Sequence, residues 1–367
     1  MKKIIFGITS LDMGGAEKVL VDLVNALCNK YDITIFTIYG NGDLESKIDN
    51  KVKIESLYSR RYNELSHLSK IKNSYLFMSK RYLKQMYEKH IKDKYDIEIA
   101  FLEGPITSLF AIEGSSKKIA WVHTNMSKHV VNIVKIKQYE NDYQKYNRII
   151  FVSNDALEGF NNTFKVDVNK QVIHNYIDTD SILKKAKEYD PKEIKNNSPA
   201  PNFLAVCRLV KVKGIDRLAL VSKKLLENGY KHKIYIVGDG PERQKIEELI
   251  KKLNLEDSFI LLGKKDNPYP YMKKCDCFIL ASLYEGYPTV LIEAMCLGKN
   301  IIATNTGAKE ALEGYELKKI VENSFDGLYD GMKQFITDSN RINDSSNLTY
   351  NCEKTIDKII SILDGEI

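Results

Sequence analysis

The sequence predicts an α/β protein made of two Rossmann-like, doubly wound domains in tandem. Short apolar runs rich in β-branched residues alternate with amphipathic helical patterns along the chain of 367 residues. Most of these runs are apolar on consecutive positions, which is typical of parallel strands buried on both faces. After a polar, proline-containing stretch near residue 200 the alternation starts again. Alternation of this kind indicates βαβ units, and the restart indicates a second sheet.

The predicted elements follow in chain order. Strands are expected at 3–8, 33–38, 97–102, 118–123, 148–153 and 171–175, and then at 203–207, 233–238, 259–263, 277–282 and 301–304. Amphipathic helices are expected over 15–29, 154–164, 213–228 and 241–253. These elements predict an N-terminal domain over 1–189, a linker over 190–201 and a C-terminal domain over 202–349. A C-terminal helix is expected over 350–367, with packing back on the N-terminal domain as one option.

Composition favours an ordinary globular protein. Hydrophobic residues make up 43% of the chain and charged residues 28%, and no run approaches the roughly 20 apolar residues of a membrane span. The apolar run at the N-terminus is interrupted by Thr9, Ser10 and Asp12, so it is interpreted as a first strand and not as a signal peptide. The six cysteines suggest reduced thiols, and no histidine pair has ligand spacing, so no metal site is predicted.

A basic segment runs from Arg60 to Lys94. It holds ten lysines and arginines against three acidic residues, and six aromatic residues accompany it at positions 58, 62, 75, 77, 82 and 87. One interpretation is a set of solvated helix faces. The other is a patch for an anionic membrane surface, with lysines toward lipid and tyrosines at the interface. Nucleic acid is disfavoured because no nucleic-acid-binding module is present.

Two cations follow the strand predicted at 203–207. Arg208 comes at the strand exit and Lys213 is expected to open the next helix. Ligands of open α/β sheets bind beyond the carboxyl ends of the strands, so the active site is expected in the cleft between the two domains. A guanidinium, an ammonium and helix amides suit an anion such as phosphate. Taken alone, a solvated pair of surface cations explains the same pattern.

A second anion site is predicted at the stretch EGYPTVLIEA. Pro288 is expected as the first helical residue, which leaves amides near Thr289 and Val290 free for phosphate. Glu285 precedes this helix and is placed to accept hydrogen bonds from sugar hydroxyls. Glu293 lies inside the helix among apolar residues, which argues against a purely solvated role. The alternatives are a dipole-complementing Glu285 and a solvated Glu293.

Six short motifs occur in an order and spacing that resemble the family-4 retaining glycosyltransferases with the GT-B fold. They are GGAEKVL at 14–20, WVH at 121–123, HNYID at 174–178, R-x4-KG at 208–214, VGDGP at 237–241 and EGYPTVLIEA at 285–294. Each motif is weak alone, but the ordered set spans almost the whole chain. The E-x7-E signature of the family is present as Glu285 and Glu293.

The resemblance implies roles for individual residues. Arg208 and Lys213 match positions that bind the donor diphosphate, and Glu285 matches the glutamate at the donor sugar. His123 matches a histidine at the reaction centre, although a lone histidine at a strand end is usually structural. The catalytic set implied is therefore His123, Arg208, Lys213 and Glu285. The donor-binding set comprises Gly14, Gly15, Arg208, Lys213, Gly238, Glu285, Gly286, Thr289, Val290 and Glu293.

The glycine pair Gly14 and Gly15, between the first predicted strand and the first predicted helix, has two explanations. A tight turn accounts for one glycine and leaves the second without a reason. Two residues without side chains would also let backbone amides of Gly14 and Gly15 approach the donor phosphates, as in the N-domain half of a split phosphate site.

The expected activity is retaining transfer of a hexose or N-acetylhexosamine from a nucleotide sugar, UDP being the expected nucleotide, without cofactor or metal. The acceptor is expected to be a lipid-linked glycan of surface-polysaccharide or capsule assembly, so the enzyme is expected in the cytoplasm, peripheral at the inner face of the cell membrane. Front-side attack is favoured over a covalent intermediate, without being settled by the sequence. The alternatives are a nucleotide-sugar epimerase of the same fold and a noncatalytic glycosyltransferase-like partner.

Overall fold

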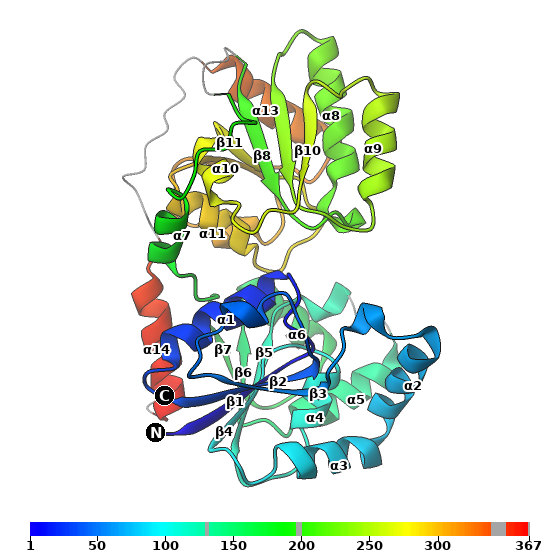
Figure 1. Ribbon diagram of the computed structural model, residues 1–367, viewed down its shortest axis with the longest axis vertical. Coiled ribbons are helices and arrows are strands. Elements are labelled where there is room, and N and C mark those ends of the chain that lie inside the picture. Colours follow the sequence, from blue (N-terminus) through cyan, green and yellow to red (C-terminus); the bar gives the residue numbers. More distant parts are fainter. Residues whose placement is uncertain (129–131, 196–199, 339–349, 366–367) are drawn as a thin grey trace. The chain divides into compact units, whose positions relative to one another are not determined.

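The computed structural model describes residues 1–128, 132–195, 200–338 and 350–365, apart from the side chains of 74–76 and 78. Its chain forms two compact units (Figure 1). Unit 1 comprises Met1–Ile177 together with Glu353–Ile367, and unit 2 comprises Asp178–Cys352. The sequence-based linker over 190–201 lies partly outside the described residues, as does the boundary at residue 349. The boundary expected after residue 189 lies within unit 2.

Unit 1 is built on a parallel sheet of seven strands in the order β3-β2-β1-β4-β5-β6-β7. The strands are β1 Lys3–Ile8, β2 Asp32–Tyr39, β3 Lys53–Tyr58, β4 Ile97–Ala100, β5 Lys117–Val122, β6 Arg148–Phe151 and β7 Asn169–Val172. The central strands β1 and β4 are buried almost throughout, as the consecutive apolar runs predict.

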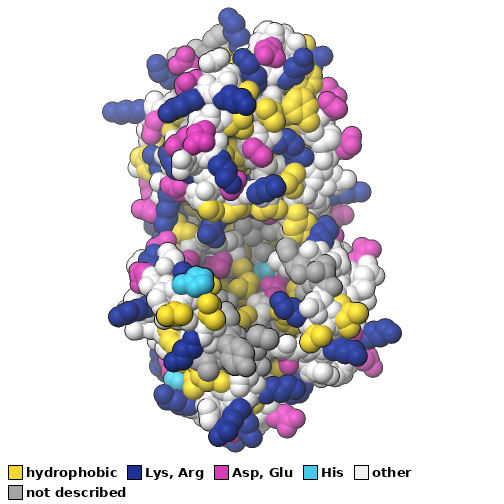
Figure 2. Space-filling view, turned by 90° about the vertical axis from the view of Figure 1, so that its right-hand side faces the viewer, with side chains coloured by type: hydrophobic (Ala, Val, Ile, Leu, Met, Phe, Trp, Pro, Cys, Tyr) yellow, Lys and Arg dark blue, Asp and Glu magenta, His cyan; other side chains and the backbone are white. Residues whose placement is uncertain are grey.

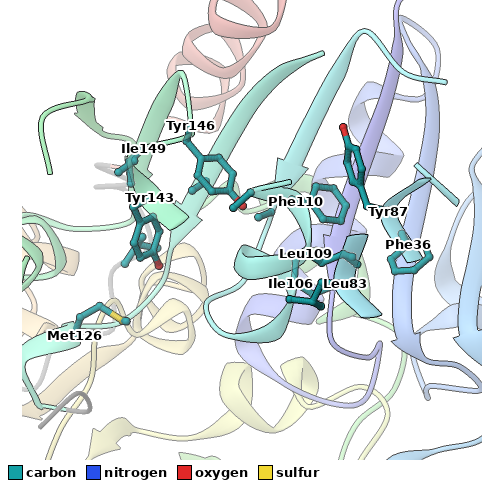
Figure 3. Packing of buried hydrophobic residues seen from close by; sticks show 14 of the residues in the cluster. Phe36, Leu83, Tyr87, Ile106, Leu109, Phe110, Met126, Tyr143, Tyr146 and Ile149 are labelled. Atoms are coloured by element: carbon teal, nitrogen blue, oxygen red, sulfur yellow. The ribbon is translucent and has the colours of Figure 1, made fainter. Parts of the chain in front are cut away.

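Helices cover both faces of this sheet. They are α1 Gly15–Leu27, α2 His67–Met78, α3 Lys80–His90, α4 Pro105–Phe110, α5 Ile133–Tyr143, α6 Asn154–Thr163 and α14 Cys352–Asp364. Helix α1 lies on one face, and α3 and α4 lie on the other (Figure 1). Leu83 of α3 packs close to Ile106, Leu109 and Phe110 of α4 in the buried core (Figure 3).

The C-terminal helix α14 belongs to unit 1 from Glu353 onward. Lys2 Nζ donates to the carbonyl oxygens of Leu363 and Asp364 at 3.0 and 2.9 Å, which caps the end of the helix with a cation. The Asp364 carboxylate accepts from Lys30 at 2.7 Å and from the Tyr31 hydroxyl at 2.8 Å. The end of α14 is therefore bonded to the residue before β1 and to the loop between α1 and β2.

Unit 2 contains a second parallel sheet, with six strands in the order β10-β9-β8-β11-β12-β13. The strands are β8 Asn202–Val206, β9 Lys233–Val237, β10 Phe259–Gly263, β11 Cys277–Leu280, β12 Asn300–Thr304 and β13 Lys318–Val321. The helices are α7 Thr179–Lys185, α8 Ile215–Glu227, α9 Arg243–Lys252, α10 Tyr269–Lys274, α11 Thr289–Cys296, α12 Ala308–Ala311 and α13 Phe325–Thr337. The two doubly wound sheets confirm the predicted fold class.

Two strands are absent from the sequence prediction. Both β3, KIESLY, and β13, KKIV, are edge strands that are only partly buried. Their lysine, glutamate and serine residues interrupt the apolar pattern, so a search for continuous apolar runs misses these two strands. No helix in the described part of the chain has the length and apolar character needed to cross a bilayer.

Candidate active site

Each sheet reverses its strand order once, and ligands of such sheets bind at the carboxyl ends of the strands beside that point. The reversal lies between β1 and β4 in unit 1 and between β8 and β11 in unit 2. Residues 9–14 and 101–104 follow these strands in unit 1, and 207–214 and 281–288 follow them in unit 2. Most of the candidates from the sequence lie in or next to these four segments.

The segment after β8 contains two cations, one without a side-chain partner and one in an ion pair. Arg208 is exposed, and its side chain has no hydrogen-bond or ion-pair partner among the described residues. Lys213 ends a single 3₁₀ turn, and Gly214 follows it with φ 62°. The expectation that Lys213 opens the helix is therefore wrong, because the left-handed Gly214 separates it from α8, which begins at Ile215.

Lys213 is paired with the loop after β11. Its Nζ lies 2.5 Å from Oε1 of Glu285. The Ser282 hydroxyl donates to the same oxygen at 2.6 Å. Oε2 of Glu285 has no hydrogen-bond partner in the described part of the chain. The two residues that the sequence assigns to the donor diphosphate and the donor sugar are thus in direct contact.

Backbone contacts hold the two loops together. The Leu283 amide donates to the Val212 carbonyl oxygen at 2.8 Å, and Arg217 of α8 donates to the Ala281 carbonyl oxygen at 2.7 Å. A Cβ at Gly214 would lie only 2.3 Å from that Ala281 oxygen. Only glycine at position 214 lets the two loops come this close. The short distance between Lys213 and Glu285 therefore depends on Gly214.

Helix α11 leaves its first amides without a side-chain cap. Pro288 is the residue before the helix, with ψ 94°, and not its first residue as expected from the sequence. The amides of Thr289 and Val290 remain suited to an anion, because the first turn of a helix has no intrahelical acceptors for them. Glu293 is only 6% exposed, which excludes the solvated interpretation of this residue.

Of the other two glycines assigned to the donor, Gly238 has a packing reason in unit 2. It has φ 141°, and a Cβ there would lie 1.9 Å from the Cys207 carbonyl oxygen. Gly286 instead approaches Gly307 with its backbone, because its carbonyl oxygen lies 2.3 Å from where a Cβ at Gly307 would stand. Gly238 and Gly307 therefore permit close contact between neighbouring loops.

Gly14 and Gly15 begin α1 in unit 1, and both are exposed. Gly14 is extended, with φ −154°, and neither glycine has a positive φ. The explanation by a tight turn that only glycine can adopt is therefore wrong. A Cβ at Gly14 would lie 2.1 Å from Oε2 of Glu17, so Gly14 has a local packing reason, whereas for Gly15 the lack of a side chain at the exposed start of the helix remains.

His123 follows β5 in unit 1 and is 9% exposed. Burial lowers the pKa of its imidazole to about 3, and a hydrogen bond with the Phe101 backbone offsets this only in part. The ring is therefore neutral at physiological pH. Its Nε2 is buried and has no hydrogen-bond partner among the described residues, while the ring packs 4.8 Å from that of Phe101. A buried nitrogen without a partner is available to a ligand hydroxyl.

Glu103 is a site residue that the sequence-based argument missed. Its Oε1 accepts the backbone amides of His123 at 2.5 Å and of Thr124 at 2.8 Å. Burial raises the pKa of this carboxyl, and the amide hydrogen bonds oppose the shift. The signal was present, because Glu103 follows an apolar strand and precedes a glycine and a proline that start α4. Glu103 therefore fixes the turn that carries His123.

The basic segment forms α2 and α3 of unit 1. Exposed cations of the segment are Arg60, Lys72, Lys80, Arg81, Lys84, Lys89, Lys92 and Lys94. The expected outward-facing aromatic residues are mostly not found, because Phe77 and Tyr87 lie in the core and the Tyr58 and Tyr82 hydroxyls are bonded at 2.9 Å. Among the described aromatic side chains of this segment, only Tyr62, at 46%, is exposed, and Tyr75 lies outside the described side chains. The helix α3 buries one face, so its aromatic residues pack inward and its charges point outward.

Comparison with known proteins agrees with this architecture. Residues 13–181 match the family described as Glycosyltransferase Family 4, and residues 186–355 match Glycosyl transferases group 1. An uncharacterized glycosyltransferase of Methanocaldococcus jannaschii is 30% identical over 56% of this chain, which spans about half (53%) of that protein.

Two further similarities extend over the whole chain. The N-acetylgalactosamine-N,N'-diacetylbacillosaminyl-diphospho-undecaprenol 4-alpha-N-acetylgalactosaminyltransferase of Campylobacter jejuni is 27% identical over 98% of this chain and 97% of its own. The crystal structure of Anabaena HepE in complex with UDP and glucose has a TM-score of 0.78 at 18% identity, with all of both chains covered. The ordered motifs, the two doubly wound sheets and these matches together show that the chain belongs to the family-4 glycosyltransferases with the GT-B fold.

Proposed function

We propose that this glycosyltransferase moves a hexose or N-acetylhexosamine from a UDP-sugar to a lipid-linked glycan with retention of anomeric configuration. The observation that carries the proposal is the ion pair of Lys213 and Glu285 at the strand-order reversal of unit 2, with the exposed Arg208 in the same loop as Lys213. An unpaired guanidinium and an ammonium suit the diphosphate of a nucleotide sugar. The vacant Oε2 of Glu285 suits a hydroxyl of the sugar.

Lys213, Glu285 and Arg208 also suit the charge changes of the reaction. The acceptor oxygen forms a bond to the anomeric carbon while the bond from that carbon to the diphosphate oxygen breaks. The acceptor proton passes to the departing phosphate, so negative charge grows on the leaving group. Arg208, Lys213 and the first amides of α11 would stabilise that charge, a task that a divalent ion performs in other transferases. His123 and the loop of Gly14 and Gly15 are proposed to act in unit 1.

The state of Glu285 favours front-side attack over a covalent glycosyl intermediate. Its Oε1 already accepts two hydrogen bonds, one of them from a cation. Such bonds stabilise the carboxylate and make it a weaker nucleophile. Glu285 is therefore proposed to hold the donor sugar and not to attack it.

The similar proteins support the substrate classes. HepE is described in complex with UDP and glucose, and the Campylobacter relative is named for a diphospho-undecaprenol acceptor. By analogy, the acceptor here is proposed to be a glycan carried on a lipid diphosphate, built at the inner face of the cell membrane for surface polysaccharide or capsule.

A lipid-linked acceptor requires contact with a membrane surface, and unit 1 offers a suitable one. Leu68 and Ile71 lie one turn apart on α2 and are 79% and 56% exposed. Ile133 and Val134 at the start of α5 are 71% and 74% exposed. Figure 2 shows hydrophobic side chains bordered by lysine and arginine side chains on the unit 1 surface. Exposed apolar residues beside cations suit an anionic bilayer.

The test is a transfer assay with radiolabelled UDP- and GDP-sugars and a membrane lipid extract. We expect one UDP-sugar to label the lipid fraction with release of UDP, and the product to keep the anomeric configuration. Conversion of a donor in the absence of lipid would support the epimerase alternative. If nucleotide binds and no donor is consumed with any acceptor, the transferase proposal is wrong.

A further inference from the structure

The structure assigns to Ser282 the role of a positioning residue that holds the Glu285 carboxylate in one orientation, so that one of its oxygens stays free for the donor sugar. This inference rests on the proposed function of Glu285. Ser282 is 1% exposed, and its hydroxyl donates to Oε1 of Glu285 at 2.6 Å. Lys213 donates to the same Oε1, so both protein donors saturate one oxygen. The second oxygen, Oε2, is left for a substrate hydroxyl.

The position of Ser282 is itself fixed by the sheet. Thr304, the last residue of β12, is fully buried, and its hydroxyl donates to the Ser282 carbonyl oxygen at 2.6 Å. The preceding residue, Ala281, accepts from Arg217 at 2.7 Å. Two hydrogen bonds therefore fix the backbone at Ala281 and Ser282. The single proton of the Ser282 hydroxyl is donated to Glu285.

The arrangement has a consequence for Lys213. An ammonium has three N–H donors, so Lys213 can keep one bond to Glu285 while it donates others to the donor diphosphate. Without the Ser282 hydroxyl, Glu285 is held by Lys213 alone, and the carboxylate can rotate about its Cγ–Cδ bond while it keeps the ion pair. The free oxygen is then no longer held in one direction.

A double-mutant cycle of Ser282→Ala and Glu285→Gln tests the inference, with three measurements on each variant: turnover, UDP affinity by calorimetry and the free energy of unfolding of unit 2. We expect Ser282→Ala to lower kcat about tenfold, the loss of one hydrogen bond to a charged group, and to leave the UDP dissociation constant within about twofold. In the Glu285→Gln background the same change should have little further effect on kcat. Ser222→Ala is the matched control, because Ser222 is a fully buried serine of unit 2 whose hydroxyl lies 2.8 Å from His232 Nε2.

The outcomes separate the inference from the proposed function. A wild-type protein that transfers no sugar contradicts the proposed function, and the unfolding cycle then decides whether Ser282 and Glu285 are coupled. Unchanged kcat in Ser282→Ala, or a loss that simply adds to that of Glu285→Gln, overturns the positioning role. A loss of kcat in Ser222→Ala as large as that in Ser282→Ala would also overturn it, because both would then reflect lost stability.

Discussion

The ammonium of Lys213 lies 2.5 Å from the carboxylate of Glu285, across 72 positions of sequence. Lys213 lies in the segment after β8, and Glu285 lies in the segment after β11. These two strands flank the strand-order reversal of unit 2. In the free protein each of these half-buried groups neutralises the other. In the proposed donor complex, phosphate and sugar would bind to a pair that is already formed, which lowers the cost of ordering two side chains.

Removal of the ammonium should weaken transfer strongly. Lys213→Ala deletes the charge that is proposed to stabilise the leaving diphosphate, so we expect kcat to fall by about 10²–10³. It also leaves Glu285 with Ser282 as its only described partner. Lys224→Ala removes an exposed lysine from α8 of the same unit and should leave kcat unchanged. Equal turnover of both variants with the best UDP-sugar would contradict the assignment of Lys213.

Two variants of Glu103 separate its hydrogen bonds from its charge. Glu103→Gln keeps an oxygen that can accept the His123 and Thr124 amides, whereas Glu103→Ala leaves two partly buried amides unpaired. We expect Glu103→Ala to lower kcat about tenfold more than Glu103→Gln and to cost about 1–3 kcal/mol of stability. Steady-state kinetics and chemical unfolding provide the comparison. If both variants lose the same activity, the charge and not the turn is what matters.

The buried His123 should make unit 1 less stable in acid. Its pKa in the folded protein is about 3, whereas an unfolded histidine titrates near 6.5. Between these values the unfolded chain binds the extra proton, so the free energy of unfolding falls as pH decreases from about 6.5 toward 3. Above pH 7 the contribution is constant. Thermal unfolding of wild type and His123→Asn between pH 5 and 8 checks this, and a variant with the same pH slope as wild type would contradict it.

The glycines at 15 and 214 should respond differently to substitution. Gly15 is exposed and has no positive φ, so Gly15→Val should change stability by no more than about 0.5 kcal/mol while it lowers donor turnover. Gly214 has φ 62° and no room for a Cβ, so Gly214→Ala should lower both stability and turnover. Melting temperature and kcat/KM are measured on the same preparations. Full activity of Gly15→Val would remove Gly15 from the donor site.

Binding to anionic vesicles should depend on the charges of α3. Lys80→Glu with Arg81→Glu reverses two exposed cations, and each is worth about 1 kcal/mol near an anionic surface. We expect co-sedimentation with phosphatidylglycerol vesicles to drop sharply and the wild-type binding to weaken at high salt. Lys251→Glu with Lys252→Glu makes the same charge change on α9 of unit 2 and serves as the control. Wild-type binding that is equal on neutral vesicles would rule out the electrostatic contact.

The sequence by itself determined the two doubly wound sheets, most of their strands and the residues beside the strand exits. Continuous apolar runs report burial on both faces, and motifs such as R-x4-KG and EGYPTVLIEA are local, so both are visible in one dimension. Sequence could not reveal the edge strands β3 and β13, whose polar residues match no buried pattern.

Only the tertiary structure decided which side chains are hydrogen-bond partners. Ser282, Lys213 and Glu285 meet at one carboxylate oxygen, and Glu103 reaches the His123 amide from another strand. Burial likewise separated Tyr87, which packs into the core, from the exposed Tyr62 in the same basic segment. Such contacts depend on strand order and on loop approach at glycines such as Gly214. These contacts follow from packing across the sheet, which brings together residues that are far apart along the chain.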